Sequence, residues 1–148
     1  MDRKYEYEVQ LEWKQERRGI LSSLVLESEI EVATPPEFSK GIAGLWSAEH
    51  LFVASVCTCY MSTFLSVAEG ACIDFSGFSC GSLGELAMKD GNLVVQEITL
   101  SPKVIISDRH LIAKAFKIMD VAGRKCMISN SIKSRVSIAP TVKLSDDK

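Results

Sequence analysis

The amino-terminal part of the chain alternates between apolar and polar residues. From Lys4 to Trp13 the apolar side chains occupy every second position, which is the period of a half-buried strand. A second alternating run covers residues 24–32, after a polar stretch from Lys14 to Gly19. The pattern therefore predicts a hairpin with its turn in that polar stretch, followed by an irregular loop at the prolines and glycines of residues 35–44.

A long apolar segment follows this loop. Ser47 is a favourable N-cap residue, and no helix breaker occurs before Gly70, so we expect a helix that runs to Ala68. Its apolar residues fall on nearly every side instead of forming one stripe. We therefore expect it to be the central element of the fold and to be buried on most faces. The cover comes either from the rest of the chain or from a dimer partner.

The second half of the chain predicts two strands, two helices and a last strand. The strands cover residues 73–88 and 93–106, and the Asp-Gly pair between them indicates a hairpin. Asp108 can cap a helix that reaches Ala122 and stops at Gly123, and Cys126 begins or precedes a short helix. The last strand, residues 135–144, contains a proline and so belongs at a sheet edge.

This order of elements indicates one mixed α+β domain over residues 1–148. The chain has 148 residues, 47% of them hydrophobic, which is enough for a sizeable core. Its 17 basic and 19 acidic residues leave no basic patch for nucleic acid or an anionic membrane, so we expect a small ligand. The charged start and the lack of a long uninterrupted apolar run lead us to expect a soluble, cytoplasmic protein.

Five cysteines are many for such a chain, and their odd number argues against a framework of structural disulfides. Cys57 and Cys59 point to opposite sides of the central helix, because two positions correspond to ~200°. Cys59 shares its side with small hydroxyl residues and is the more site-like of the two, whereas Cys57, Cys72 and Cys80 are typical of core thiols.

Other uses of these residues are less favoured. A zinc site built from Cys57, Cys59, Cys126 and His50 is conceivable, but the opposed directions of the first two disfavour a tetrahedron. A Cys-His hydrolase is disfavoured too, since His50 lies about 180° from Cys59 around the helix.

A reactive cysteine has to be a thiolate, which needs a nearby positive charge or helix N-terminus. Cys59 lies more than three turns into its helix, where the effect of the helix dipole has faded. We therefore expect a cation to activate it. Arg17, Arg18 and Lys40 are the candidates because they precede the helix in polar segments.

Two segments of the chain resemble the OsmC/Ohr family. Residues 47–60 (SAEHLFVASVCTCY) are similar to the family pattern in which a Pro-Glu pair is followed, ten residues after the Glu, by a cysteine. Residues 122–129 (AGRKCMIS) are similar to the segment with a second cysteine, a proline and a serine. The resemblance places Cys59 at the nucleophile position and Cys126 at the resolving position, and it covers essentially the whole chain.

The resemblance implies an OsmC-like fold, with antiparallel sheets around long central helices in an intertwined homodimer. It also implies a peroxiredoxin-like activity that reduces organic hydroperoxides, with hydrogen peroxide as an alternative substrate, in oxidative or osmotic stress defence. Cys59 would become a sulfenic acid and condense with Cys126 to a disulfide. An external thiol or dithiol would reduce it again, so we expect no cofactor and no metal.

The chain departs from the family pattern at three points. Ala48 replaces the proline before Glu49, and Met127 replaces the proline after Cys126. The family arginine, which Glu49 would hold in place, matches either Arg17 or Arg18 in the early hairpin, while the loop offers Lys40; we favour Arg18. The alternative function is an OsmC-like ligand-binding or redox-sensing domain without efficient peroxidase activity.

Overall fold

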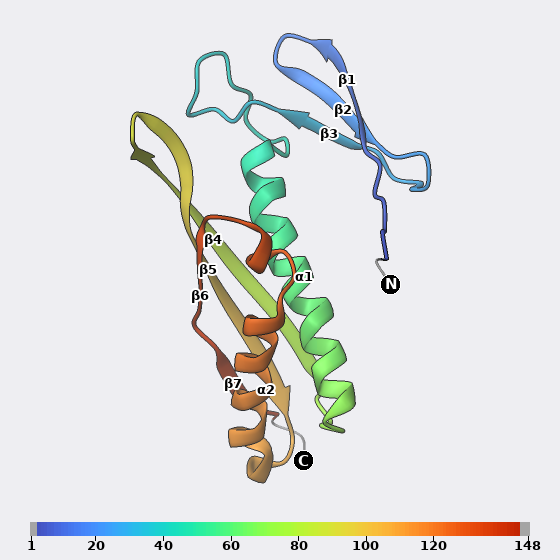
Figure 1. Ribbon diagram of the computed structural model, residues 1–148, viewed down its shortest axis with the longest axis vertical. Coiled ribbons are helices and arrows are strands. Elements are labelled where there is room, and N and C mark those ends of the chain that lie inside the picture. Colours follow the sequence, from blue (N-terminus) through green and yellow to red (C-terminus); the bar gives the residue numbers. More distant parts are fainter. Residues whose placement is uncertain (1–2, 146–148) are drawn as a thin grey trace. The chain divides into compact units, whose positions relative to one another are not determined.

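The structure is a computed structural model that describes residues 3–145. The chain divides into two compact units, Met1–Leu51 and Phe52–Lys148, which we call unit 1 and unit 2. Each contains its own β-sheet, and the chain as a whole has the predicted mixed α+β composition. Figure 1 shows the strands and helices of both units.

Unit 1 holds a three-stranded antiparallel sheet in the order β1-β2-β3. Its strands are β1 (Gln10–Gln15), β2 (Arg18–Ser22) and β3 (Ile30–Ala33). The predicted turn over residues 14–19 is too long, because the chain reverses in a two-residue turn at Glu16 and Arg17. Glu16 takes a positive φ of 51° there, as the tight hairpin turns that match strand twist require. Arg18 and Gly19 consequently belong to β2.

The first part of the predicted amino-terminal strand is unpaired in the single chain. Residues 3–9 form no strand, and Tyr5, Tyr7 and Val9 are 70%, 90% and 62% exposed. The alternation of apolar and polar residues is therefore present without a neighbouring strand from the described part of the chain. The predicted second strand is also shorter than expected, since residues 24–29 form the connection to β3.

Unit 2 is built around a long antiparallel hairpin, β4 (Gly77–Lys89) and β5 (Asn92–Ile106). Its turn lies at Asp90 and Gly91, both with positive φ, so the predicted Asp-Gly hairpin is confirmed. Two short strands, β6 (Arg135–Ile138) and β7 (Thr141–Leu144), pair in parallel with the other side of β5. The predicted last strand is thus split around Pro140, which cannot donate to a ladder, and it lies at the sheet edge as expected.

The helices are α1 (Ala48–Gly70) and α2 (Ile112–Lys125), with the 3₁₀ turns η1 (Arg109–Leu111) and η2 (Ser129–Ser131). Asp108 caps η1, since its carboxylate accepts a hydrogen bond from the N–H of His110 at 2.9 Å. Gly123 does not end α2. It lies inside the helix, where a Cβ would stand only 2.1 Å from Cδ1 of Ile138, so glycine permits α2 to approach β6.

The core of unit 2 lies between its sheet and its helices. Alternate residues of β5 point inward to meet one stripe of α1 and the inner face of α2. The stripe on α1 consists of Val56, Tyr60, Phe64 and Ala68. The expectation that this helix is buried on most faces is therefore wrong for the single chain. By length and composition α1 resembles a membrane span, but a core helix passes the same test.

Candidate active site

The structure brings Cys59 and Cys126 together within unit 2. Cys59 lies in α1, and Cys126 is the first residue after α2, where the backbone turns to an extended conformation with ψ of 113°. Cys126 is fully buried, and its Sγ lies 3.9 Å from the carbonyl oxygen of Val56, one turn before Cys59. The Cys126 thiol donates to that carbonyl, and the two thiols lie close enough for each to shift the pKa of the other. Two cysteines far apart in the sequence are thus direct neighbours.

The segment after Cys126 surrounds the sulfurs with hydrogen-bond donors. Asn130 and Ser131 donate their N–H groups to the carbonyls of Cys126 and Ile128, at 3.1 and 2.9 Å. The N–H groups of Met127 and Ile128 are directed to Cys59 instead, and the N–H and hydroxyl of Ser129 are directed to Cys126. Consecutive peptide N–H groups that converge on one place are a common means of binding negative charge.

Cys59 is the more acidic of the two thiols. Partial burial raises its pKa. The N–H groups of Ile128 and Met127 and the nearby thiol of Cys126 lower it by a larger amount, so the net pKa lies below the usual range. The hydroxyl of Thr63 also lies close, but it has one hydrogen and donates it to the carbonyl of Cys59 at 2.9 Å. The single hydrogen of the Cys126 thiol is likewise donated, to the carbonyl of Val56, so we assign the lowering mainly to the peptide groups of Ile128 and Met127.

Cys126 behaves in the opposite way. Burial raises its pKa, the hydroxyl and N–H of Ser129 lower it, and the neighbouring sulfur of Cys59 raises it again, so that the net pKa lies above the usual range. As the pH rises, Cys59 therefore loses its proton before Cys126 does. This is the division of roles that a nucleophile and a resolving thiol need.

Cys57 and Cys80 form a second thiol neighbourhood on the core side of α1. Both pack against the hydrophobic core, and Cys57 donates its S–H to the carbonyl of Ala54 at 3.4 Å. Burial, together with the nearby Cys57, raises the pKa of Cys80 to about 11. These two thiols thus match the expectation of core cysteines, whereas Cys72 is exposed at the end of α1.

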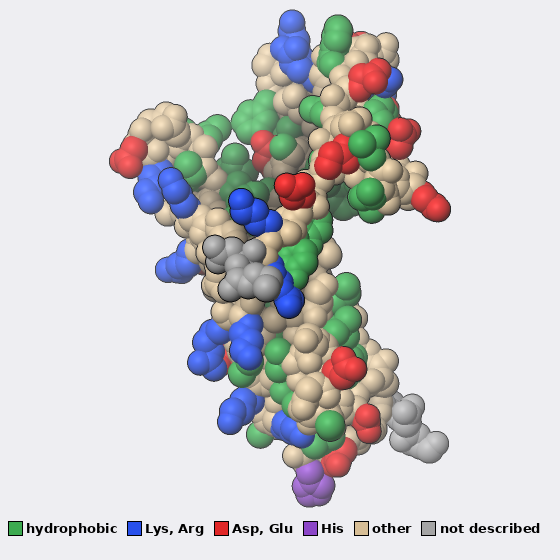
Figure 2. Space-filling model, turned by 45° about the vertical axis from the view of Figure 1, so that its right-hand side comes forward, with side chains coloured by type: hydrophobic (Ala, Val, Ile, Leu, Met, Phe, Trp, Pro, Cys, Tyr) green, Lys and Arg blue, Asp and Glu red, His purple; other side chains and the backbone are tan. Residues whose placement is uncertain are grey.

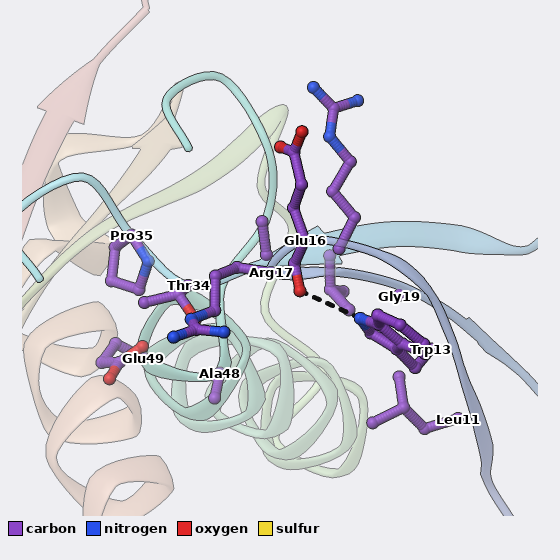
Figure 3. Close-up of a pocket in the computed structure, with 12 residues that line it drawn as sticks. Leu11, Trp13, Glu16, Arg17, Gly19, Thr34, Pro35, Ala48 and Glu49 are labelled. Atoms are coloured by element: carbon purple, nitrogen blue, oxygen red, sulfur yellow. Dashed lines mark hydrogen bonds between the residues drawn. The ribbon is translucent and has the colours of Figure 1, made fainter. Parts of the chain in front are cut away.

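Unit 1 contains a separate pocket of about 490 Å³ in which Glu49 lies. Figure 3 shows the side chain of Arg17 directed toward Glu49, past Thr34 and Pro35. Arg18 lies in β2 opposite Ala33, and its guanidinium pairs with Glu31 at 3.5 Å. The structure therefore brings Arg17 to Glu49, although the sequence favoured Arg18. The reason is the position of the turn, which makes these adjacent residues point to opposite faces.

The other residues considered from the sequence, Lys40 and His50, lie outside both the thiol pair and the pocket of Glu49. Lys40 is exposed in the loop, with a positive φ of 62°. His50 is held at the start of α1, where its Nδ1 lies 2.7 Å from the hydroxyl of Ser47, and Ser47 caps the helix by accepting the N–H of His50. Among residues 3–145 no three side chains of His, Cys, Asp or Glu cluster as metal ligands.

Comparison with family models identifies the chain. Residues 41–141 match the model described as OsmC-like protein. The chain belongs to the OsmC-like protein family. This result confirms the resemblance drawn from the sequence, and the matched residues include both cysteine segments.

Solved structures of this family share the fold. An OsmC-like protein of unknown function from Vibrio cholerae superimposes with a TM-score of 0.84 at 20% identity, over 93% of this chain and 99% of that one. An organic hydroperoxide resistance protein from Elizabethkingia anophelis superimposes with a TM-score of 0.77 at 20% identity, over 98% of this chain and 100% of that one. The organic hydroperoxide resistance protein OhrB of Bacillus subtilis superimposes with a TM-score of 0.68 at 19% identity, over 95% of this chain and 98% of that one. No curated protein matches the sequence.

The site residues that the sequence missed are the peptide N–H donors of the segment after Cys126. A backbone group leaves no mark in residue type, with one exception. Proline has no N–H, so the replacement of the family proline by Met127 was the one available sign that an additional donor stands beside the cysteines.

Proposed function

We propose that the protein is a thiol-dependent peroxidase that reduces organic hydroperoxides. The Cys59 thiolate attacks the distal oxygen of the hydroperoxide, the O–O bond breaks, and the alcohol leaves with a proton. The sulfenic acid formed on Cys59 then condenses with Cys126, which releases water and forms a disulfide. An external dithiol then reduces this disulfide to two thiols and is itself oxidised to a disulfide.

The observation that carries this proposal is the pairing of the two thiols. Cys59 and Cys126 are neighbours, and their pKa values are displaced in opposite directions, downward for Cys59 and upward for Cys126. One sulfur is therefore ready to attack while the other retains its proton. Relatives in the family named for organic hydroperoxide resistance support the substrate class.

We further propose that two copies of the chain assemble into a homodimer, in the cytoplasm. Residues 3–9 carry the alternation of a strand but have no neighbour in the single chain, and Leu11 and Trp13 of β1 are 66% and 71% exposed. Figure 2 shows apolar side chains at the surface of both units. A soluble monomer rarely exposes so many large apolar groups together, and a second copy would cover them.

The test is peroxide consumption by the purified protein with a dithiol reductant. We expect Cys59→Ser to abolish turnover, and Cys126→Ser to allow one oxidation per site and then stop. Cys57→Ser is the matched control because it changes a thiol of the same helix on its core side, and it should retain turnover. Full activity of Cys59→Ser would disprove the proposal.

The same measurement distinguishes a peroxidase from the alternative, a binding or redox-sensing domain. A protein of that kind would bind or be oxidised by a peroxide without repeated turnover, even with dithiol in excess. Several hydroperoxides should be compared, because a hydrophobic pocket distinguishes organic groups that differ by one methylene by about 10- to 200-fold.

A further inference from the structure

Tyr60 connects three elements of unit 2 from a fully buried position in α1. Its hydroxyl donates a hydrogen bond to the carbonyl of Met119 in α2 at 2.9 Å. Its ring stacks on Phe78 of β4, with the ring centroids 6.2 Å apart and the planes at 22°. The residue before it in the chain is Cys59. Tyr60 therefore holds α2 through its hydroxyl and β4 through its ring, directly beside the first thiol.

The hydrogen bond lies on the side of α2 that leads to Cys126. Met119, Gly123 and Cys126 follow one another at intervals of four and three positions, which places them on one side of the helix. A Cβ at Gly123 would stand 3.9 Å from Cε2 of Tyr60, so α2 stays near the tyrosine for a full turn beyond Met119. The hydroxyl thus holds α2 about two turns, or ~10 Å, before the second thiol.

Two other hydrogen bonds join this helix pair, and neither can replace that of Tyr60. Nζ of Lys114 donates to the carbonyl of Ala71 at 2.8 Å, but it is exposed and lies at the opposite end of α2, ~18 Å from Cys126 along the helix. The thiol of Cys126 donates to the carbonyl of Val56 over 3.9 Å, and a thiol is a weak donor. The strong polar contact near the end of α2 is therefore that of Tyr60.

The phenol is suited to a fixed contact. Burial holds the pKa of Tyr60 above its usual range, so the hydroxyl keeps its hydrogen and stays a neutral donor. A hydrogen bond also has a preferred distance and direction, whereas apolar contacts between two helices are not directional. The hydroxyl consequently restricts sliding of α2 along α1.

We propose that Tyr60 is a positioning residue for the thiol pair, and that its hydroxyl holds the end of α2 where Cys126 can reach Cys59. This inference rests on the proposed function, in which the pair closes to a disulfide. The tyrosine acts through the backbone of Met119 and exchanges no proton with either sulfur. Its effect is on the effective concentration of one thiol at the other, which depends steeply on geometry.

Tyr60→Phe isolates this effect. Phenylalanine keeps the ring that stacks on Phe78 and removes the hydroxyl alone. The carbonyl of Met119 still accepts the N–H of the residue four positions later in α2, so no buried acceptor loses its last partner. The variant should therefore fold, which circular dichroism checks, while the end of α2 moves more freely in the dithiol form.

The experiment is a redox equilibrium of the full-length protein with glutathione, without peroxide. Two protein thiols and one glutathione disulfide give the Cys59–Cys126 disulfide and two molecules of glutathione, which receive the two electrons and two protons that the thiols lose. The product is measured as the cross-linked peptide by mass spectrometry. We expect Tyr60→Phe to lower the equilibrium constant by about two- to tenfold, the range that corresponds to one hydrogen bond.

Two control variants separate positioning from a general loss of stability. Lys114→Met removes the hydrogen bond at the far end of α2 and should keep the wild-type equilibrium constant. Ile98→Val removes one methylene from a fully buried residue of β5, at a cost in stability similar to that of a hydrogen bond, and should keep it too. The pH profile for alkylation of Cys59 should be unchanged in Tyr60→Phe, because the hydroxyl donates to Met119 and not to a sulfur.

A wild-type equilibrium constant in folded Tyr60→Phe would overturn the proposal, as would an equal decrease in either control variant. Because the equilibrium requires no peroxide, this result is independent of the proposed function. If the protein consumes no peroxide but the constant falls as expected, the peroxidase function is wrong and the role of Tyr60 stands. If peroxide is turned over but the constant does not change, the role of Tyr60 is wrong and the peroxidase function stands.

Discussion

The peptide N–H of Met127 offers a direct test of how Cys59 is activated, because proline can remove it alone. The side chain of Met127 is 69% exposed, and its N–H makes no backbone hydrogen bond among the described residues. Cys126 already has the extended conformation, with φ of −63° and ψ of 113°, that a residue before proline prefers. Met127→Pro should therefore fold normally and lack one donor to Cys59.

The magnitude follows from the strength of a hydrogen bond to a charged group, about 1.5–3 kcal/mol. Cys59 is partly exposed, so solvent screening reduces this to about 1 kcal/mol, which corresponds to about fivefold less thiolate at a pH below the pKa. The higher nucleophilicity of a more basic thiolate offsets part of this loss, and alkylation of Cys59 should slow about two- to threefold.

The assay is alkylation of Cys59 by a small electrophile as a function of pH, in a background where Cys126 is serine. Met127→Ala is the matched control, since it removes the same exposed side chain but keeps the N–H, and its pH profile should equal that of the parent. If the profile of Met127→Pro also equals that of the parent while the protein is folded, the peptide group does not activate Cys59 and the reasoning is refuted.

Three more predictions concern other parts of the chain. If a cation of the hairpin activates Cys59, Arg17→Ala should slow its alkylation and Arg18→Ala should not, and the wild-type rate in both variants would exclude this role for either. The folded-state pKa of Cys80, about 11, lies above its unfolded value of about 8.5, so its stabilising effect of about 2 kcal/mol is present below that value and is lost as the pH rises toward 11. The free energy of unfolding should fall less steeply over this range in Cys80→Ala than in the wild type, whereas Cys72→Ala should follow the wild type. Sedimentation should show a dimer at micromolar concentration, and a stable monomer would contradict the proposed assembly.

The sequence predicted the elements whose signals are local. The Asp-Gly turn of the β4–β5 hairpin, the cap at Ser47 and the edge position of Pro140 follow from backbone preferences of single residues, and each is found in the structure. The first hairpin was placed less well because its turn contains neither glycine nor asparagine. Glu16 adopts the left-handed conformation there, which no propensity of glutamate indicates.

The candidate site was predictable in its thiols and not in their surroundings. Cys59 and Cys126 were identified by their place in two motifs, and the structure brings them together. The choice of Arg18 over Arg17 depended on the register of one turn, since a shift by one residue exchanges the faces of a strand. The peptide donors beside Cys59 depend on the conformation of the chain after α2, which residue types do not encode.

Gly84 of β4 sets the height at which α1 rests above the sheet. A Cβ at this position would stand 2.4 Å from a methyl carbon of Val53, a β-branched side chain with little freedom to turn away. Any larger residue would lift this end of the helix, and Cys59 is carried on the same helix. A residue of the sheet that takes no part in the proposed chemistry therefore helps to set the distance between the two sulfurs.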